Sequence, residues 1–284
     1  MKKTYTQEQQ DFIQKNYSSM GAVKCSKKLG LSDRHIRKIA GRLGIKVDKK
    51  IRGAIARVNA INRPPKQNSQ YSVNPEQFYD IKTAAIAYIL GFIWADGYVY
   101  SKNYQHKISI YCLKEDFDEI LPIINQTGNW PIFYRKRQNR RMTGEASISN
   151  KPLVKFLIHN DYTSKSHKSA SKILNKIPEH LKRYWFLGLI DGDGCFYYNK
   201  LHRLQQFSVC SSYDQDWGFL TNLLKSLGVR SKVTRRIQGK NKHSVVRVCG
   251  YKNIQKIFNY LYPNNYEIGF TRKYQNAALC SKPL

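Results

Sequence analysis

Apolar side chains recur every three or four positions over residues 1–46, a spacing typical of amphipathic helices. The pattern predicts a first helix that begins at Thr6, a second over residues 20–30 and a third that begins at Ser32. Gln9, three residues after Thr6, completes the sequence pattern of a capping box. We therefore expect a small all-α domain in which a short helix, a turn with a glycine and a basic helix follow one another, as in helix-turn-helix proteins.

The third predicted helix carries basic residues on its polar side. They are Arg34, His35, Arg37, Lys38 and Arg42. In a helix-turn-helix domain the last helix enters the major groove, so these side chains are candidates for contacts with bases and phosphates. The alternative is a basic three-helix scaffold that binds another protein. Residues 1–46 also resemble the small helix-turn-helix modules attached to phage and bacterial endonucleases, which favours DNA.

Residues 47–80 differ in composition from the segments on either side. They are basic at first and then rich in Pro, Asn, Gln and Ser, and the pair Pro64 and Pro65 excludes a continuous helix. We predict a basic linker. Two interpretations stay open: an extended strap that lies along DNA, and a passive tether.

The chain repeats itself after residue 80. Residues 81–178 and residues 179–284 each contain, in order, a helix, a strand-like hairpin, a second helix, a second hairpin and a third helix. Two copies in one chain predict an α+β body with an approximate two-fold axis, formed by two αββαββα repeats.

The first helix of each repeat is strongly apolar. Residues 84–95 are apolar nearly all round, which predicts a buried helix, and the stretch is shorter than the ~20 residues of a membrane span. Gly91 and Gly188 lie inside the two matched helices, where a glycine costs about 1 kcal/mol. We expect both glycines at a helix–helix interface where the backbones approach so closely that a side chain would not fit.

Each of the two matched helices ends in an aspartate followed by a glycine. Asp96 and Asp193 therefore lie at helix C-termini, where the helix dipole already places about −0.5 charge. Packing the two ends together concentrates negative charge, and a hard divalent cation with carboxylate and carbonyl ligands would relieve the repulsion. A single aspartate at such a place can be a turn residue that caps its own loop, but a matched pair favours a metal site.

The two helix ends resemble the nine-residue signature of the LAGLIDADG homing endonucleases, with ILGFIWADG at residues 89–97 and FLGLIDGDG at residues 186–194. The second copy is nearly complete. The first copy has Trp94 where the signature has an acid, so its equivalent Asp191 is interpreted as structural or as a support for the metal ligands, and its loss from the first copy need not abolish activity. The resemblance covers about residues 81–284 and implies a single-chain enzyme whose two β-sheets form saddles on double-stranded DNA.

The resemblance also implies the roles of several residues. Asp96 and Asp193 would be the catalytic and metal-binding acids. The carbonyl groups of Ala95 and Gly192 would be further ligands of Mg²⁺, or of another divalent cation such as Mn²⁺ or Ca²⁺. Zinc is disfavoured, because the six cysteines form no CxxC pair and show no zinc-ligand spacing with histidines.

A basic side chain near each acid is implied as well, because a lysine often lies near the metals in this family. The repeat alignment makes Lys165 and Lys273 the candidate catalytic lysines, with Arg272 and Lys168 as alternatives. An ordinary phosphate contact is a comparable explanation for such lysines in a strongly basic protein.

The predicted hairpins alternate polar and apolar positions, which gives each sheet one face for the helices and one face for DNA. A basic stretch at residues 133–141 is expected to pass over phosphates. The candidates for DNA contact on the hairpins and on this stretch are Lys107, Tyr111, Arg135, Arg137, Lys232 and Arg236.

The 284-residue chain has 49 Lys and Arg against 19 Asp and Glu, a formal charge of +30. Such an excess favours a polyanionic partner, and we expect double-stranded DNA ahead of an acidic membrane surface. Host intron RNA is a second candidate partner. The N-terminus has no apolar stretch of a signal peptide, so we expect a cytoplasmic, monomeric protein from a bacterium or a phage.

The leading functional prediction is a site-specific, Mg²⁺-dependent DNA endonuclease that hydrolyses a phosphodiester bond in both strands of a long recognition site. Two alternatives stay open. One is a DNA-binding regulator that keeps the fold without cleavage, and the other is an RNA-splicing maturase of the same fold.

Overall fold

The computed structural model describes residues 5–54, 72–102, 105–136, 141–202, 204–239 and 241–283. The chain forms two units, Met1–Ser69 and Gln70–Leu284. Each unit has a hydrophobic core of its own.

The smaller unit contains helices α1 (Gln7–Leu29) and α2 (Asp33–Arg42). The predicted capping box begins α1, because the Thr6 side chain accepts from the Gln9 N–H while the Gln9 side chain accepts from the Thr6 N–H. Gly21, with φ 73° and ψ 173°, interrupts the helical backbone. The single element α1 therefore holds the two helices that the apolar pattern predicts.

The turn between α1 and α2 follows from two local signals. Gly30 ends α1 in the left-handed conformation, with φ 66°, which glycine adopts without steric cost. Ser32 then caps α2 by accepting a hydrogen bond from the His35 N–H. The buried side chains Ile13, Cys25, Ile36 and Ile39 form the centre of this core.

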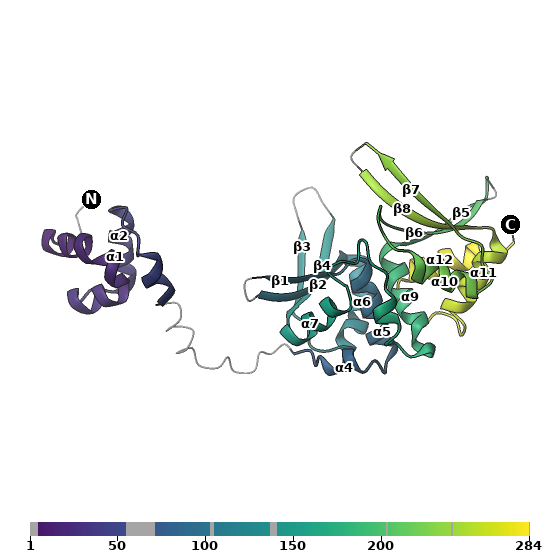
Figure 1. Ribbon diagram of the computed structural model, residues 1–284, viewed down its shortest axis with the longest axis horizontal. Helices are drawn as coiled ribbons and strands as arrows, with labels where there is room; N and C mark the ends of the chain where they lie inside the picture. Colours follow the sequence, from purple (N-terminus) through teal and green to yellow (C-terminus); the bar gives the residue numbers. More distant parts are fainter. Residues whose placement is uncertain are drawn as a thin grey trace. The chain divides into compact units, whose positions relative to one another are not determined.

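The larger unit contains two repeats with the same element order (Figure 1). The first repeat consists of α5 (Ala84–Ala95), β1 (Tyr98–Lys102), β2 (Gln105–Leu113), α6 (Lys114–Gln126), β3 (Ile132–Lys136), β4 (Met142–Ser149) and α7 (Lys151–His159). The second repeat consists of α9 (Glu179–Asp193), β5 (Gly194–Asn199), β6 (Leu204–Ser212), α10 (Gly218–Ser226), β7 (Lys232–Gln238), β8 (Asn241–Cys249) and α11 (Tyr251–Leu261). Three further helices are α4 (Glu76–Tyr79), α8 (Ser171–Leu174) and α12 (Thr271–Cys280).

Each repeat contributes one four-stranded antiparallel sheet. The strand orders are β1-β2-β4-β3 and β5-β6-β8-β7. Corresponding positions pair in the same way, Tyr98 with Ser109 in the first sheet and Cys195 with Ser208 in the second. In Figure 1 the β3–β4 and β7–β8 hairpins project to the same side of the unit. The α+β fold with two αββαββα repeats is confirmed, and α12 is an addition at the end of the second repeat.

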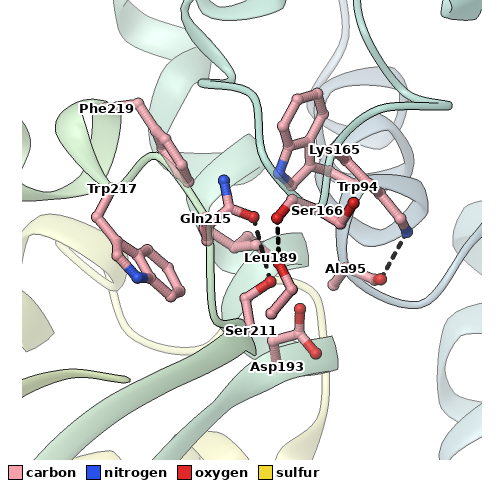
Figure 2. A pocket seen from close by; sticks show the side chains of 11 residues that line it. Trp94, Ala95, Lys165, Ser166, Leu189, Asp193, Ser211, Gln215, Trp217 and Phe219 are labelled. Atoms are coloured by element: carbon pink, nitrogen blue, oxygen red, sulfur yellow. Dashed lines mark hydrogen bonds between the residues drawn. The ribbon is translucent and has the colours of Figure 1, made fainter. Parts of the chain in front are cut away.

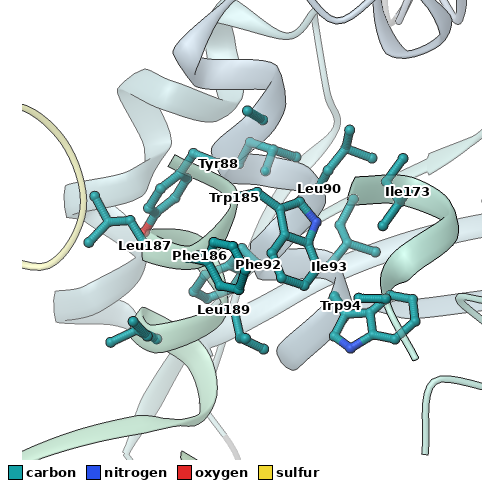
Figure 3. Packing of buried hydrophobic residues seen from close by; sticks show 14 of the residues in the cluster. Tyr88, Leu90, Phe92, Ile93, Trp94, Ile173, Trp185, Phe186, Leu187 and Leu189 are labelled. Carbon is teal, nitrogen blue, oxygen red and sulfur yellow. The ribbon is translucent and has the colours of Figure 1, made fainter. Parts of the chain in front are cut away.

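Helices α5 and α9 pack against each other at the centre of the larger unit, where Figure 3 shows their side chains interleaved. A Cβ on Gly91 would lie 1.9 Å from the carbonyl oxygen of Trp185, and a Cβ on Gly188 would lie 2.1 Å from that of Tyr88. Both glycines therefore permit a backbone approach that no other residue would allow. In the described part of the chain, no helix combines the length and apolar character needed to cross a bilayer.

The predicted linker ends earlier than residue 80. Residues 55–71 lie outside the described residues, but residues 72–80 belong to the larger unit. Val73 and Phe78 are buried in its core, and the side-chain amide of Asn150 donates a 2.8 Å hydrogen bond to the Val73 carbonyl. The expected boundary was wrong because Val73 and Phe78, two apolar residues in an otherwise polar segment, bind this segment to the core.

Candidate active site and DNA-facing surface

Asp96 and Asp193 lie at the matched ends of α5 and α9. Asp96 caps the C-terminus of α5, and Asp193 is the last residue of α9. The two helix ends touch, since a Cβ on Gly192 would lie 2.4 Å from the Ala95 Cβ and 3.2 Å from Asp96 Oδ2. The absence of a side chain at position 192 therefore lets the Asp96 carboxylate approach the backbone at the end of α9.

The surroundings disfavour negative charge on both acids. Burial raises the pKa of Asp193 to about 7, and the neighbouring charge of Asp96 adds to this increase. Burial of the site also raises the pKa of Asp96, although this residue keeps an exposed surface. Lys165 and Lys273 act in the opposite direction on both carboxyl groups. Two carboxylates at helix C-termini repel each other and the negative ends of the helix dipoles, and a bound cation would relieve this repulsion.

The donor atoms at this place fit a hard divalent cation. Carboxylate and backbone carbonyl oxygens are the ligands that Mg²⁺, Mn²⁺ and Ca²⁺ prefer. Among the described residues, no group of three or more His, Cys, Asp or Glu side chains is arranged to hold a metal ion. A site based on Asp96 and Asp193 would therefore depend on carbonyl, water and phosphate oxygens, as Mg²⁺ sites with few carboxylates commonly do.

Each acid has a lysine at the end of its own helix. The oxygens that accept hydrogen bonds from Lys165 Nζ are the carbonyls of Ile93 (3.0 Å), Ala95 (2.7 Å) and Gly97 (2.8 Å). Those that accept from Lys273 Nζ are the carbonyls of Ile190 (3.2 Å) and Gly194. Because these carbonyls occupy equivalent positions in the two repeats, the lysines do so as well, and each complements the negative end of a helix dipole.

Burial makes both lysines weaker bases than usual. It lowers the pKa of Lys165 to about 8, against the opposing charges of Asp193 and Asp96. It also lowers the pKa of Lys273. An amine with a pKa near neutrality can take up or release a proton at physiological pH.

The two alternative basic residues are placed differently. Arg272 forms a bidentate ion pair with Asp116, with both nitrogen–oxygen distances at 2.7 Å. The side chain of Lys168 is exposed. The cations that influence the charge of Asp96 and Asp193 are instead Lys165 and Lys273.

The signature position that differs between the repeats is buried in both. Asp191 is 1% exposed, and its Oδ2 accepts hydrogen bonds from the Tyr88 hydroxyl (2.7 Å) and the Phe270 N–H (2.9 Å). Trp94 is 3% exposed and contacts the rings of Tyr162 and Trp185, with centroid distances of 5.0 and 6.1 Å. Polar contacts in one repeat are thus replaced by ring packing in the other.

A cavity of about 320 Å³ opens beside Asp193. Figure 2 shows Lys165 and Trp94 on one side of this cavity and Trp217 and Phe219 on the other. Hydroxyl and amide groups, among them Ser211, complete the lining, and Ser211 donates a 3.1 Å hydrogen bond to Gln215. The cavity has room for water beside the carboxylate, and aromatic rings form part of its wall.

A groove of about 830 Å³ extends from Asp96 across the sheet of the first repeat. Lys107, Tyr111 and Arg135, which the sequence predicts for DNA contact, line it. Arg137 lies outside the described residues. Sequence reasoning missed Glu145, whose carboxylate lies 3.3 Å from the Lys107 ammonium and 3.1 Å from the Arg135 guanidinium.

The equivalent face of the second sheet is also basic. Lys232 and Arg236 are exposed on β7, and in the strand pairing they lie opposite Arg247 and His243 of β8. Sequence reasoning missed Arg247, whose Nε is buried and has no hydrogen-bond partner among the described residues. The signal that identifies Arg247 and Glu145 is the pairing register, which places them on the same face as the predicted residues.

The smaller unit presents a separate basic surface. The exposed residues on its second helix are Arg34, Arg37, Lys38 and Arg42, and His35 is half-buried. The buried residues Ile36, Ile39 and Ala40 lie on the side that packs on α1. The helix therefore separates an apolar side from a basic one, as the sequence predicts.

Comparison with solved structures finds this fold in I-WcaI, a homing endonuclease solved bound to its DNA recognition sequence. That structure is 14% identical, with a TM-score of 0.50 over 77% of this chain and 96% of that chain. The I-LtrWI LAGLIDADG homing endonuclease, solved bound to target DNA, is 16% identical, with a TM-score of 0.46 over 72% and 90%. I-SmaMI, solved bound to uncleaved DNA target with calcium ions, is 18% identical, with a TM-score of 0.44 over 73% and 89%. No protein-family model and no curated protein sequence matches the chain.

The larger unit thus has the fold of the homing endonuclease I-WcaI, with two antiparallel four-stranded sheets flanking the α5–α9 crossing. At this level of sequence identity the shared fold does not establish the activity, which depends on the residues of the site.

Proposed function

We propose that the protein is a site-specific DNA endonuclease that hydrolyses one phosphodiester bond in each strand with the help of Mg²⁺. The observation that carries this proposal is the meeting of Asp96 and Asp193 at two helix ends, each end with its own lysine bound to the helix-end carbonyls. Paired carboxylates have no stabilising role at helix C-termini, where the dipole already supplies negative charge. A metal-dependent reaction explains why both are present.

Asp96 and Asp193 would hold the divalent cations, together with the carbonyl oxygens of Ala95 and Gly192. A cation bound there supplies positive charge that polarises the phosphate and lowers the pKa of an attacking water. Lys165 and Lys273 would offset the charge that develops on the phosphate, and Lys165, whose pKa is lowered to about 8, would also be able to pass a proton. The cavity beside Asp193 would hold the water.

Double-stranded DNA would lie across the two sheets and make a second contact with α2. The proposed contacts on the sheets are Lys107, Tyr111, Arg135, Lys232, Arg236 and the newly found Arg247, and Arg137 of the basic stretch at residues 133–141 is proposed as well. The formal charge of +30 supports a long electrostatic footprint and an affinity that falls steeply with salt. The two repeats in one chain support a monomer as the active form.

Cleavage of a randomised duplex library in Mg²⁺ tests this proposal. The wild type is compared with Asp96→Asn and Asp193→Asn, which keep the shape of each side chain and remove its charge. We expect double-strand cleavage by the wild type at one site or a narrow family of sites, and none by either variant. Tight binding of one duplex without cleavage by the wild type would favour the DNA-binding regulator instead.

A further inference from the structure

The lysine-bearing segment of each repeat is held by the opposite repeat. In the second repeat this segment is the start of α12, where Phe270 is the N-cap but offers no side-chain acceptor. Glu119 of α6, in the first repeat, accepts a 2.6 Å hydrogen bond from the Thr271 N–H. Asp116 of the same helix holds the Arg272 guanidinium at two points, each at 2.7 Å.

These contacts fix the first turn of α12, in which Lys273 is the third residue. Two carboxylates at a helix N-terminus also interact favourably with the positive end of its dipole. Asp116 is 8% exposed, and although the Arg272 side chain keeps 53% of its surface exposed, the two parallel hydrogen bonds fix the orientation of the guanidinium. The first repeat thus caps α12 and determines where the Lys273 side chain begins.

The second repeat likewise contacts the lysine-bearing segment of the first repeat, but through neutral hydrogen bonds and not through carboxylates. The segment that follows Lys165 is contacted by the end of β6 and the loop after it, in the second repeat. Ser212 donates a hydrogen bond to the carbonyl of Ser166, and the amide of Gln215 donates one of 2.7 Å to the carbonyl of Lys168. Gln215 is 2% exposed, and its oxygen accepts from Ser211, so its orientation is fixed by its own neighbours.

We infer that Asp116 and Glu119 are positioning residues for Lys273, and that Ser212 and Gln215 are positioning residues for Lys165. Each catalytic lysine is then aligned by the repeat that does not contain it, and neither half of the protein completes a site alone. The inference rests on the proposed endonuclease function for its catalytic consequence. We call the Asp116 and Glu119 contacts the Lys273 clamp, and the Ser212 and Gln215 contacts the Lys165 clamp. The contacts themselves predict that disturbing one clamp affects one lysine and spares the other.

Strand-resolved cleavage tests the catalytic consequence. The duplex selected from the library carries a different label on each strand, and single-turnover rates are measured at saturating protein. Lys273→Met and Lys165→Met first show which strand depends on which lysine. Asp116→Asn and the milder Glu119→Gln are expected to slow only the Lys273-dependent strand, on the order of tenfold, because small misplacements of a catalytic group cost that much. Gln215→Leu is expected to slow only the Lys165-dependent strand.

The ratio of the two strand rates is an internal control, since partial misfolding lowers both rates together. Glu115→Gln, an exposed acid on the same helix α6, matches the charge change of Asp116→Asn and is expected to leave the ratio unchanged. Asn222→Ala, exposed on α10, serves the same purpose for Gln215→Leu. Equal slowing of both strands by Asp116→Asn, or by Gln215→Leu, would overturn the inference.

A second readout does not depend on cleavage. Acetic anhydride labels accessible lysine amines, and mass spectrometry of the full-length protein measures the labelling rate of each lysine. Asp116→Asn is expected to raise the rate at Lys273, which is 7% exposed, by about fivefold or more, and to leave Lys165 unchanged. Gln215→Leu should do the reverse. If the wild type cleaves no DNA, the proposed function fails, but the labelling rates still show whether the two clamps position their lysines. Unchanged labelling in both variants refutes the positioning roles even if cleavage is found.

Discussion

The hydroxyl of Tyr88 donates a 2.7 Å hydrogen bond to the carboxylate of Asp191 and so links the central helices of the two repeats. Burial raises the pKa of Asp191 to about 7 from an ordinary 3.8, and the Tyr88 hydrogen bond acts against this increase. The folded protein therefore binds the Asp191 proton more tightly than the unfolded chain does. This residue contributes less stability as the pH rises from about 4 to about 7.

Tyr88→Phe should therefore destabilise the protein more in alkali than in acid. We expect a loss of about 1–3 kcal/mol at about pH 8.5, where Asp191 is charged and loses a donor, and a smaller loss at about pH 5.5. Urea denaturation at the two pH values measures the difference. Tyr98→Phe, at an exposed tyrosine, is the control and should have little effect at either pH. A loss for Tyr88→Phe that does not change with pH would show that the hydroxyl does not support a charged Asp191.

The glycines at the α5–α9 crossing give a second prediction. Gly91→Ala should destabilise the larger unit by about 3 kcal/mol or more, because its Cβ would fall 1.9 Å from a backbone oxygen. Gly41→Ala is the opposite case, since Gly41 lies inside α2 and nothing is within 4 Å of its added Cβ. That change should stabilise the smaller unit by about 0.5–1 kcal/mol. Calorimetry that resolves the two units checks both, and a tolerated Gly91→Ala would contradict the close approach.

Divalent cations should stabilise the protein in a pH-dependent way. The pKa of Asp193 is about 7 in the folded protein, so without metal this residue also contributes less stability as the pH rises from about 4 to about 7. A cation binds the charged form. The increase in Tm produced by Mg²⁺ over EDTA should therefore be larger at about pH 8 than at about pH 6.

Asp193→Asn is the matched variant for the metal prediction. In EDTA at about pH 8 it should melt higher than the wild type, because a repelled charge is removed, and it should lose most of the response to Mg²⁺. An undiminished Mg²⁺ response in this variant would place the cation elsewhere.

Glu145 should determine base preference in one half of the DNA site. Its carboxylate holds Lys107 and Arg135 together on the first sheet, so Glu145→Gln releases both cations from an ion pair. We expect weaker discrimination at the base pairs under this sheet, by about 1–3 kcal/mol, with non-specific affinity increased. Sequencing of library-selected sites measures it. Glu179→Gln, exposed at the far end of α9 from Asp193, is the charge-matched control and should leave the preferred sequence unchanged.

Removal of residues 1–46 should weaken binding without moving the cut. The proposed role of α2 is to add phosphate and base contacts, whereas Asp96 and Asp193 determine the position of hydrolysis. Footprinting should show a shorter protected region, and the combined change Arg37→Ala with Lys38→Ala should reproduce part of the loss of affinity. A displaced cleavage position after the deletion would falsify the assignment of this unit as an anchor.

Local and periodic signals in the sequence predicted much of the fold. The capping box at Thr6, the cap at Ser32 and the apolar helix at residues 84–95 each depend on neighbours in the chain, and each is present. The two repeats were visible for the same reason, because their signatures and the order of the elements recur. The positions of Asp96, Asp193, Gly91 and Gly188 followed once the helix ends were matched.

What depends on contacts between distant segments was not predictable. Val73 and Phe78 looked like isolated apolar residues in a polar linker, and only the assembled core shows that they are anchors. The repeat alignment made Arg272 an alternative to Lys273, and its ion pair with Asp116, 156 positions away, is visible only in the folded structure. The face of the sheet on which Glu145 and Arg247 lie depends on strand register, because a one-residue shift would turn each side chain to the other face.

The matched register positions of the two sheets do not carry the same side chains. Glu145 lies opposite Tyr111 in the first sheet, and its equivalent in the second is Val245, opposite Cys210. Glu145 offers a charged acceptor on the first sheet, whereas Val245 is 5% exposed and offers no polar side-chain atom, so the two sheets would present different groups to DNA. If the protein is the proposed endonuclease, we expect its preferred DNA site to be asymmetric and not a palindrome, so that the protein engages it in one orientation only. Each half of such a site would then be changed through one sheet without altering the other, so the duplicated fold would give a single chain two recognition surfaces that can change independently.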